Sequence, residues 1–417
     1  MSRVAAPDAR AARRAAWRAA GRPPDALVFL VIVAGVWIAW QILRNALVLT
    51  TPPGLALRLG PDSPTVLTRA AEVELAAGRV DAAQRLAQRA LTRQPFNVAA
   101  LRVAGLAAAR EGDLDAANQM LTLAGNWSLR DDPAQSWLVR HRLEQGRAAS
   151  ALAHADTLMR RRTDLRPMYF DLMINLALRN DVEAQGALVA LLRREPPWRI
   201  DFFIYALERP EGLPVAAAVL MALKDGQGRS TDEEKARVYG TLIAQGRIEA
   251  LRAVMARAET GLRPVLTNGD FSDGAGAPPF GWVLPAGAGV LAEIANGPED
   301  GGPALHGLVS ATAERTIAEQ LVLLTPGRWR LSGRFRVDQG DLNGRMTWVL
   351  ACTAGGRVLA SAPLSATARG DWTPVSAVIE IPPDACGAQQ LRLVSRAQDR
   401  RSQVEIWMDD VTLSAVR

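Results

Sequence analysis

Four turn residues recur at one fixed spacing in the first half of this chain. Gly78, Gly112, Gly146 and Asn180 are each 34 residues apart. A polar or small pair and an alanine-rich segment follow each of them, as in Gly78-Arg-Val-Asp81-Ala-Ala. A fixed period of this size predicts stacked helical hairpins, because one hairpin alone cannot bury its apolar face.

A fifth copy of the turn, Gly246-Arg-Ile-Glu249-Ala, lies 66 residues beyond Asn180, close to two more periods. Small residues also stand where the two helices of a hairpin would cross, such as Gly105 before one turn and Ala117 after it. This pattern resembles the tetratricopeptide repeat, although leucine fills most of that family's bulky aromatic positions. The resemblance implies a helical solenoid over residues 61–259 that binds protein partners.

An apolar segment precedes the repeats. Ala26 to Leu43 contains one polar residue, Gln41, and Trp37 and Trp40 stand toward its far end. This length can cross a bilayer core, and tryptophan collects at membrane interfaces. We therefore expect a transmembrane helix over residues 26–48 and a short linker over 49–60. A cleaved signal peptide and a buried soluble helix are the alternatives.

Charge indicates how this helix would be oriented. Residues 1–25 carry six arginines against two aspartates, and arginine makes up 47 of the 49 basic residues of the chain. Such an arginine bias is typical of a GC-rich bacterial genome. The positive-inside rule predicts a cytoplasmic basic tail over residues 1–25, a single pass through the inner membrane, and a periplasmic location for the rest. No small-x-small cleavage site follows Leu49, which disfavours a signal peptide.

The period of the sequence changes after Pro264. Apolar and polar residues now alternate, with turn residues between the segments, for example from Arg328 to Val337, from Ser376 to Ile381 and from Gln390 to Val394. Alternation of this kind is typical of strands, and many short strands in about 150 residues predict a β-sandwich over residues 265–417.

Five motifs in this region resemble the jelly rolls of carbohydrate-binding modules of families 4 and 9. They are Asn268-Gly-Asp-Phe271, Gly281-Trp282, Thr325-Pro-Gly-Arg-Trp329, Asp371-Trp372-Thr and Trp407-Met-Asp409-Asp410-Val-Thr-Leu413. The resemblance implies an antiparallel jelly roll with Trp282, Trp329 and Trp372 in its core. It also implies that Asp270 and Asp409 hold a structural calcium ion, whose preferred ligands are oxygens. Otherwise Asp270 caps a turn and Asp409 is solvated.

Cys352 and Cys386 are the only cysteines, and both lie in the domain expected to be exported. An even count in an oxidising compartment predicts one disulfide, which would close a loop spanning 34 positions. The alternative is two buried thiols that only pack.

One strand near the end of the chain carries a candidate binding face. Trp407 alternates with Gln403 and Glu405, opposite an apolar face. A tryptophan on a polar face is a candidate platform for a sugar ring. The same alternation turns several arginines outward, where they could meet an acidic polysaccharide: Arg330, Arg334, Arg336 and Arg392. A solvated outer face is the alternative.

Catalysis and nucleic-acid binding find little support. The three histidines, His141 and His154 on helices and His306 in an expected loop, have no nucleophile motif beside them. Residues 265–417 carry 13 arginines, no lysine and 16 acids, so the basic excess of the chain lies elsewhere. We expect no enzyme, no cofactor apart from calcium, and no nucleic-acid partner.

The sequence thus predicts a chain with helices first and strands after them: one transmembrane helix, a helical repeat solenoid and a C-terminal jelly roll. The function that fits best is a non-catalytic, membrane-anchored periplasmic scaffold in envelope polysaccharide or exopolysaccharide assembly or export. The solenoid would bind proteins and the sandwich would contact glycan. A pure protein-interaction factor is the alternative, and a glycan-processing enzyme is the third hypothesis.

Overall fold

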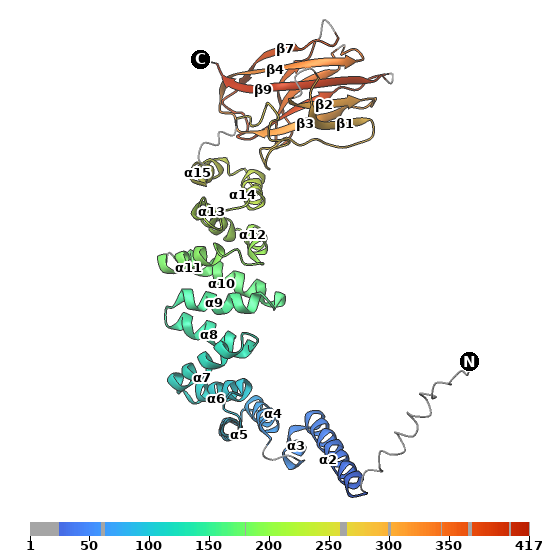
Figure 1. Cartoon of the computed structure of the whole chain (residues 1–417). Coiled ribbons are helices and arrows are strands. Elements are labelled where there is room, and N and C mark those ends of the chain that lie inside the picture. Colours follow the sequence, from blue (N-terminus) through green and yellow to red (C-terminus); the bar gives the residue numbers. More distant parts are fainter. Residues whose placement is uncertain are drawn as a thin grey trace, which may run out of the picture. The chain divides into compact units, whose positions relative to one another are not determined.

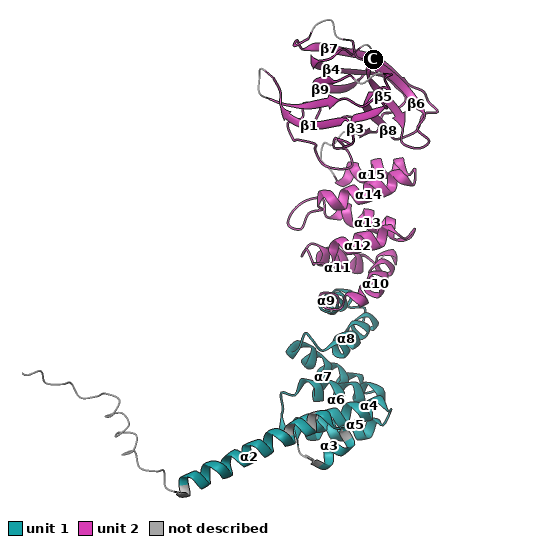
Figure 2. Ribbon diagram, turned by 90° about the vertical axis from the view of Figure 1, so that its right-hand side faces the viewer, with its two compact units in different colours: residues 1–158 teal, residues 159–417 magenta. Residues whose placement is uncertain are grey.

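Helices are followed by a two-sheet β-sandwich in this chain, as the sequence predicts (Figure 1). The computed structural model describes residues 25–59, 63–179, 181–258, 265–298, 302–342, 344–365, 369–399 and 402–416. The expected basic tail, apart from Asp25, and the turn at Asn180 lie outside this range. The chain divides into two compact units, residues 1–158 and 159–417 (Figure 2).

The first helix, α2, covers Asp25–Thr50. Its apolar window Leu27–Arg44 has a mean hydropathy of 2.1 and none of it is buried. At 1.5 Å per residue the helix is about 39 Å long, so it is long and apolar enough to cross a membrane. The linker expected over residues 49–60 is partly helical, because α3 occupies Pro53–Leu59. Ala56 and Leu57 pack against Val66, and this burial favours a helix there.

The helical region continues with antiparallel pairs of short helices. Their bounds are α4 Pro64–Ala76, α5 Val80–Arg93, α6 Val98–Glu111, α7 Leu114–Trp127, α8 Asp132–Glu144, α9 Ala148–Met159, the 3₁₀ turn η1 Thr163–Leu165, α10 Arg166–Leu178, α11 Val182–Leu192, α12 Arg199–Leu207, α13 Gly212–Ala222, α14 Asp232–Ala244 and α15 Ile248–Ala258.

The predicted turns join these helices. Gly78, Gly112, Gly146 and Gly246 all have φ between 67° and 89°, a left-handed conformation that favours glycine. The small crossing residues are buried as expected. A Cβ atom added at Gly105 would lie 2.7 Å from the side chain of Leu121, so glycine allows α6 and α7 to approach closely.

The sandwich consists of two antiparallel sheets. The five-stranded sheet has the order β1-β2-β9-β4-β7 and the four-stranded sheet the order β3-β8-β5-β6. The strands are β1 Val290–Asn296, β2 Pro303–Val309, β3 Arg315–Val322, β4 Gly327–Gln339, β5 Met346–Cys352, β6 Val358–Pro363, β7 Thr373–Ile381, β8 Gln389–Ser395 and β9 Val404–Ala415.

The expectation that Trp282, Trp329 and Trp372 all lie in the core between the two sheets is only partly confirmed. Trp282 and Trp348 are buried in it. Trp329 is only partly buried at its edge. Trp372 does not belong to the core and is partly exposed just before β7. Its ring instead lies beside the guanidinium of Arg334, a residue that alternates with the buried Phe335 and so points outward.

Candidate functional site

A cross-strand row of aromatic and charged residues occupies the outer face of the five-stranded sheet. The strand register aligns Glu293 of β1 with His306 of β2, His306 with Trp407 of β9, and Trp407 with Arg336 of β4. His306 was expected in a loop, but it lies in a strand because Leu305 and Val309 turn inward beside it. Residues up to about 100 positions apart thus become neighbours.

His306 lies between two carboxylates. Its Nδ1 is 3.3 Å from Oε1 of Glu293, and its Nε2 is 3.1 Å from Oε1 of Glu405. A neutral imidazole has only one N–H donor, so both contacts are hydrogen bonds only when His306 is protonated. These two contacts of His306 therefore link β1, β2 and β9 through one side chain.

The indole of Trp407 stacks on this histidine. The ring centroids are 4.3 Å apart and the ring planes differ by 20°. Trp407 is partly buried, with Val404, Ile406 and Met408 on the opposite, buried face of the strand, as the alternation predicts. One face of the indole is covered by His306, so only the remaining ring surface can meet a ligand. Its buried Nε1 has no hydrogen-bond partner among the described residues.

Arg334 makes a second cluster on the same face. Its Nη2 donates to Oδ2 of Asp409 at 2.6 Å, and its Nε lies 3.0 Å from Oδ2 of Asp410. The guanidinium carbon is 4.8 Å from the ring centroid of Trp372. A second indole thus reaches this face, which sequence reasoning missed because it assigned Trp372 to the core.

The predicted arginines do not form one basic patch. Arg336 donates to Oδ1 of Asp338 at 2.7 Å, and Arg334 is neutralised by its aspartates. Arg330 is exposed but lies six residues along β4 from Arg336, about 20 Å away. Arg392 belongs to β8, on the outer face of the other sheet. Four of the five residues predicted to contact glycan thus share a sheet, and Arg392 does not.

The two acids expected to hold calcium are both engaged. Oδ1 of Asp270 accepts a hydrogen bond from Oγ of Ser272 at 3.1 Å, as in a capped turn. Asp409 is buried and already has a cationic partner in Arg334. A divalent cation on Asp409 would have to compete with that guanidinium, so this arrangement does not fit a calcium ion shared by the two acids.

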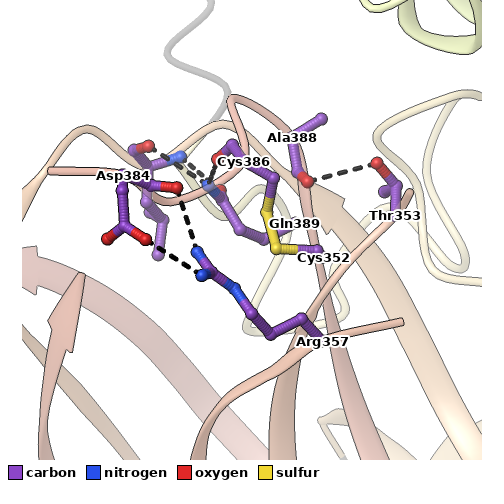
Figure 3. The surroundings of a disulfide bond; sticks show 8 residues. Cys352, Thr353, Arg357, Asp384, Cys386, Ala388 and Gln389 are labelled. Atoms are coloured by element: carbon purple, nitrogen blue, oxygen red, sulfur yellow. Dashed lines mark hydrogen bonds and ion pairs between the residues drawn. A yellow bond between two sulfur atoms is a disulfide. The ribbon is translucent and has the colours of Figure 1, made fainter. Parts of the chain in front are cut away.

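Cys352 at the end of β5 is bonded to Cys386 in the segment before β8 (Figure 3). Beside the bridge, Nη1 of Arg357 lies 3.1 Å from Oδ2 of Asp384, and Gln389 donates to the backbone oxygen of Cys386. This ion pair lowers the pKa of the Asp384 carboxyl. The bridge ties the end of β5 to the segment that leads into the neighbouring strand β8.

The other two histidines lie on helices, as predicted, and have local partners. His141 stacks on Trp137 with centroids 4.4 Å apart. Nδ1 of His154 is 2.7 Å from Oε1 of Gln135, and burial lowers the pKa of His154. Neither histidine has a nucleophilic side chain among these partners.

Comparisons with known proteins found similar solved structures that cover about a third of this chain. No family model matches the sequence, and no curated protein matches it. Among solved structures, a family 4 carbohydrate-binding module is 17% identical, with 36% of this chain and 99% of that chain covered and a TM-score of 0.29. A family 61 module in complex with β-1,4-galactotriose is 17% identical, with 37% of this chain and all of that chain covered and a TM-score of 0.27.

A third similar structure is the xylan-binding domain of family 22 from Paenibacillus barcinonensis. It is 16% identical, with 36% of this chain and 92% of that domain covered and a TM-score of 0.27. Each of these three structures is similar to this chain over 36–37% of its length. At these identities and scores the likeness does not identify a ligand for this sandwich.

Proposed function

We propose that the outer face of the five-stranded sheet binds a glycan. The observation that carries the proposal is the presence of two partly buried indoles, Trp407 and Trp372, on a face otherwise lined by charged side chains. A pyranose ring offers apolar C–H surfaces surrounded by hydroxyl groups. Indole rings match the first, and carboxylates and guanidinium groups form charge-assisted hydrogen bonds with the second.

The ion pairs around the two indoles favour a neutral glycan over the acidic polysaccharide expected from sequence. Five carboxylates meet two guanidinium groups and one imidazole in its ion pairs: Glu293, Glu405, Asp338, Asp409 and Asp410 with Arg334, Arg336 and His306. An acidic chain would approach carboxylates that are already in slight excess. Like charges at an interface oppose association.

The remaining domains give the protein its proposed setting. Helix α2 would anchor the chain in a bacterial inner membrane, with the residues after it in the periplasm, where a disulfide persists. The paired helices would bind proteins, as in tetratricopeptide repeats. The protein would thus act as a non-catalytic scaffold in envelope polysaccharide or exopolysaccharide assembly or export.

A protein-interaction factor without sugar binding is the second candidate. It is favoured by the closed network of the face, since His306 covers one side of Trp407 and Arg334 lies beside Trp372.

A glycan array separates the two functions. The full chain in detergent is applied to neutral and acidic polysaccharides, alongside a Trp372→Ala variant. Binding to a neutral glycan that the variant weakens supports the proposal. No binding to any glycan supports the protein-interaction function instead. Equal binding by both proteins contradicts the proposed face and places the glycan site elsewhere.

A further inference from the structure

An exposed aromatic edge lies on the first unit of the chain. It consists of Phe96 between α5 and α6, Trp127 at the end of α7, and Leu129 between α7 and α8. Phe96 is 74% exposed, Trp127 42% and Leu129 62%. The rings of Phe96 and Trp127 are 5.3 Å apart between centroids. All three residues therefore lie at the loops that join one hairpin to the next.

The end of α2 lies at the same edge. Nη2 of Arg69, in α4, donates to the backbone oxygen of Thr51 at 3.3 Å, directly after α2. Leu57 of α3 packs against a cluster of Leu67, Ala90 and Ala100, and the last two flank the loop that contains Phe96. Segments just after the candidate membrane span thus contact the base of the aromatic edge within one compact unit.

A second contact fixes that loop. Nδ2 of Asn97 donates to Oγ1 of Thr68 at 3.0 Å, so the residue next to Phe96 is bonded to α4. Side chains as large as Phe96 and Trp127 that stay exposed together mark a contact surface. Tryptophan and phenylalanine also settle at the boundary between headgroups and acyl chains.

We propose that the aromatic edge lies on the membrane surface, in the leaflet where α2 leaves the bilayer. Phe96, Trp127 and Leu129 insert at the headgroup level, and the first hairpins rest on the lipid. The occupant of the edge is thus the bilayer and not a protein. This inference rests on the proposed anchoring by α2, and its test separates the two.

The test uses spin labels on the full chain in vesicles of phosphatidylethanolamine and phosphatidylglycerol. The only two cysteines are bonded to each other, so an introduced cysteine is the single free thiol. Leu129→Cys reports the aromatic edge and Ile38→Cys reports the middle of α2. Glu111→Cys is the matched control, since it is exposed at the far end of α6, about 20 Å from the edge.

Power saturation then compares access to oxygen, which enters lipid, with access to a water-soluble nickel complex. We expect the oxygen-to-nickel ratio to be highest at position 38, intermediate at 129 and lowest at 111. Equal ratios at 129 and 111, with a high ratio at 38, overturn the inference and leave the anchor intact; the edge then belongs to a protein partner or a second copy. A low ratio at 38 overturns the anchor itself.

Discussion

The disulfide should carry a large share of the stability of the sandwich. Replacing both cysteines, Cys352→Ala with Cys386→Ala, removes a cross-link between positions 34 residues apart. The chain-entropy relation gives about 4 kcal/mol for a loop of this length. With a slope of about 2 kcal/mol per molar urea, the midpoint of unfolding should fall by roughly 2 M.

The assay is urea unfolding of the purified full chain in detergent, followed by near-ultraviolet circular dichroism. Trp282 and Trp348, with ring centroids 6.2 Å apart in the core, supply a signal from the sandwich. Reductant should shift the wild type by the same amount and should leave the double variant unchanged.

Arg357→Ala is the matched control, because it removes the exposed ion pair beside the bridge and keeps the bridge. Exposed ion pairs contribute little, so its midpoint should move far less. The reasoning is refuted if the double variant unfolds at the wild-type midpoint, or if reductant shifts both proteins equally.

Three further predictions concern the rest of the chain. An alkaline-phosphatase fusion after Arg417 should be active and one after Arg22 inactive; the opposite pattern would place the sandwich in the cytoplasm. Because Arg334 neutralises Asp409, a chelator should not change the melting temperature of the full chain; a drop that Asp409→Ala abolishes would restore the calcium site. Burial lowers the pKa of His154 from its ordinary 6.5, so the unfolded chain takes up a proton that the folded chain rejects, and stability falls as pH drops below 6.5. His154→Asn should reduce this loss in thermal melts between pH 7 and 5, and an unchanged loss would assign it to other groups.

Local patterns in the sequence predicted the elements of the fold well. A left-handed glycine lies in each of the two- or three-residue turns at Gly78, Gly112 and Gly146, so the spacing of these glycines marked the hairpins. Alternation likewise located β4 and the first half of β9, because one face of each of these segments is buried.

The site was harder to predict because it depends on which strands pair. Arg334 and Asp409 are 75 residues apart and His306 and Glu405 are 99 apart, so no local pattern joins them. Alternation alone shows that a side chain points outward, but not from which sheet. Arg392 was therefore grouped with arginines that lie on the other sheet. The apolar neighbours of His306 did contain a strand signal, which the prediction of a loop at this position did not take into account.

The most direct test of glycan binding compares the outer faces of the two sheets. Trp407→Ala and Arg392→Ala are titrated as full chains in detergent, by calorimetry, with a glycan that the array identifies. An aromatic contact contributes about 0.5–1.5 kcal/mol beyond burial, so Trp407→Ala should weaken binding roughly tenfold, while Arg392→Ala should leave it unchanged. Arg392→Ala should unfold at the wild-type midpoint, and Trp407→Ala only slightly below it because the stack on His306 is lost, since neither side chain lies in the core. Weaker binding by Arg392→Ala together with unchanged binding by Trp407→Ala would contradict the assignment of the five-stranded face.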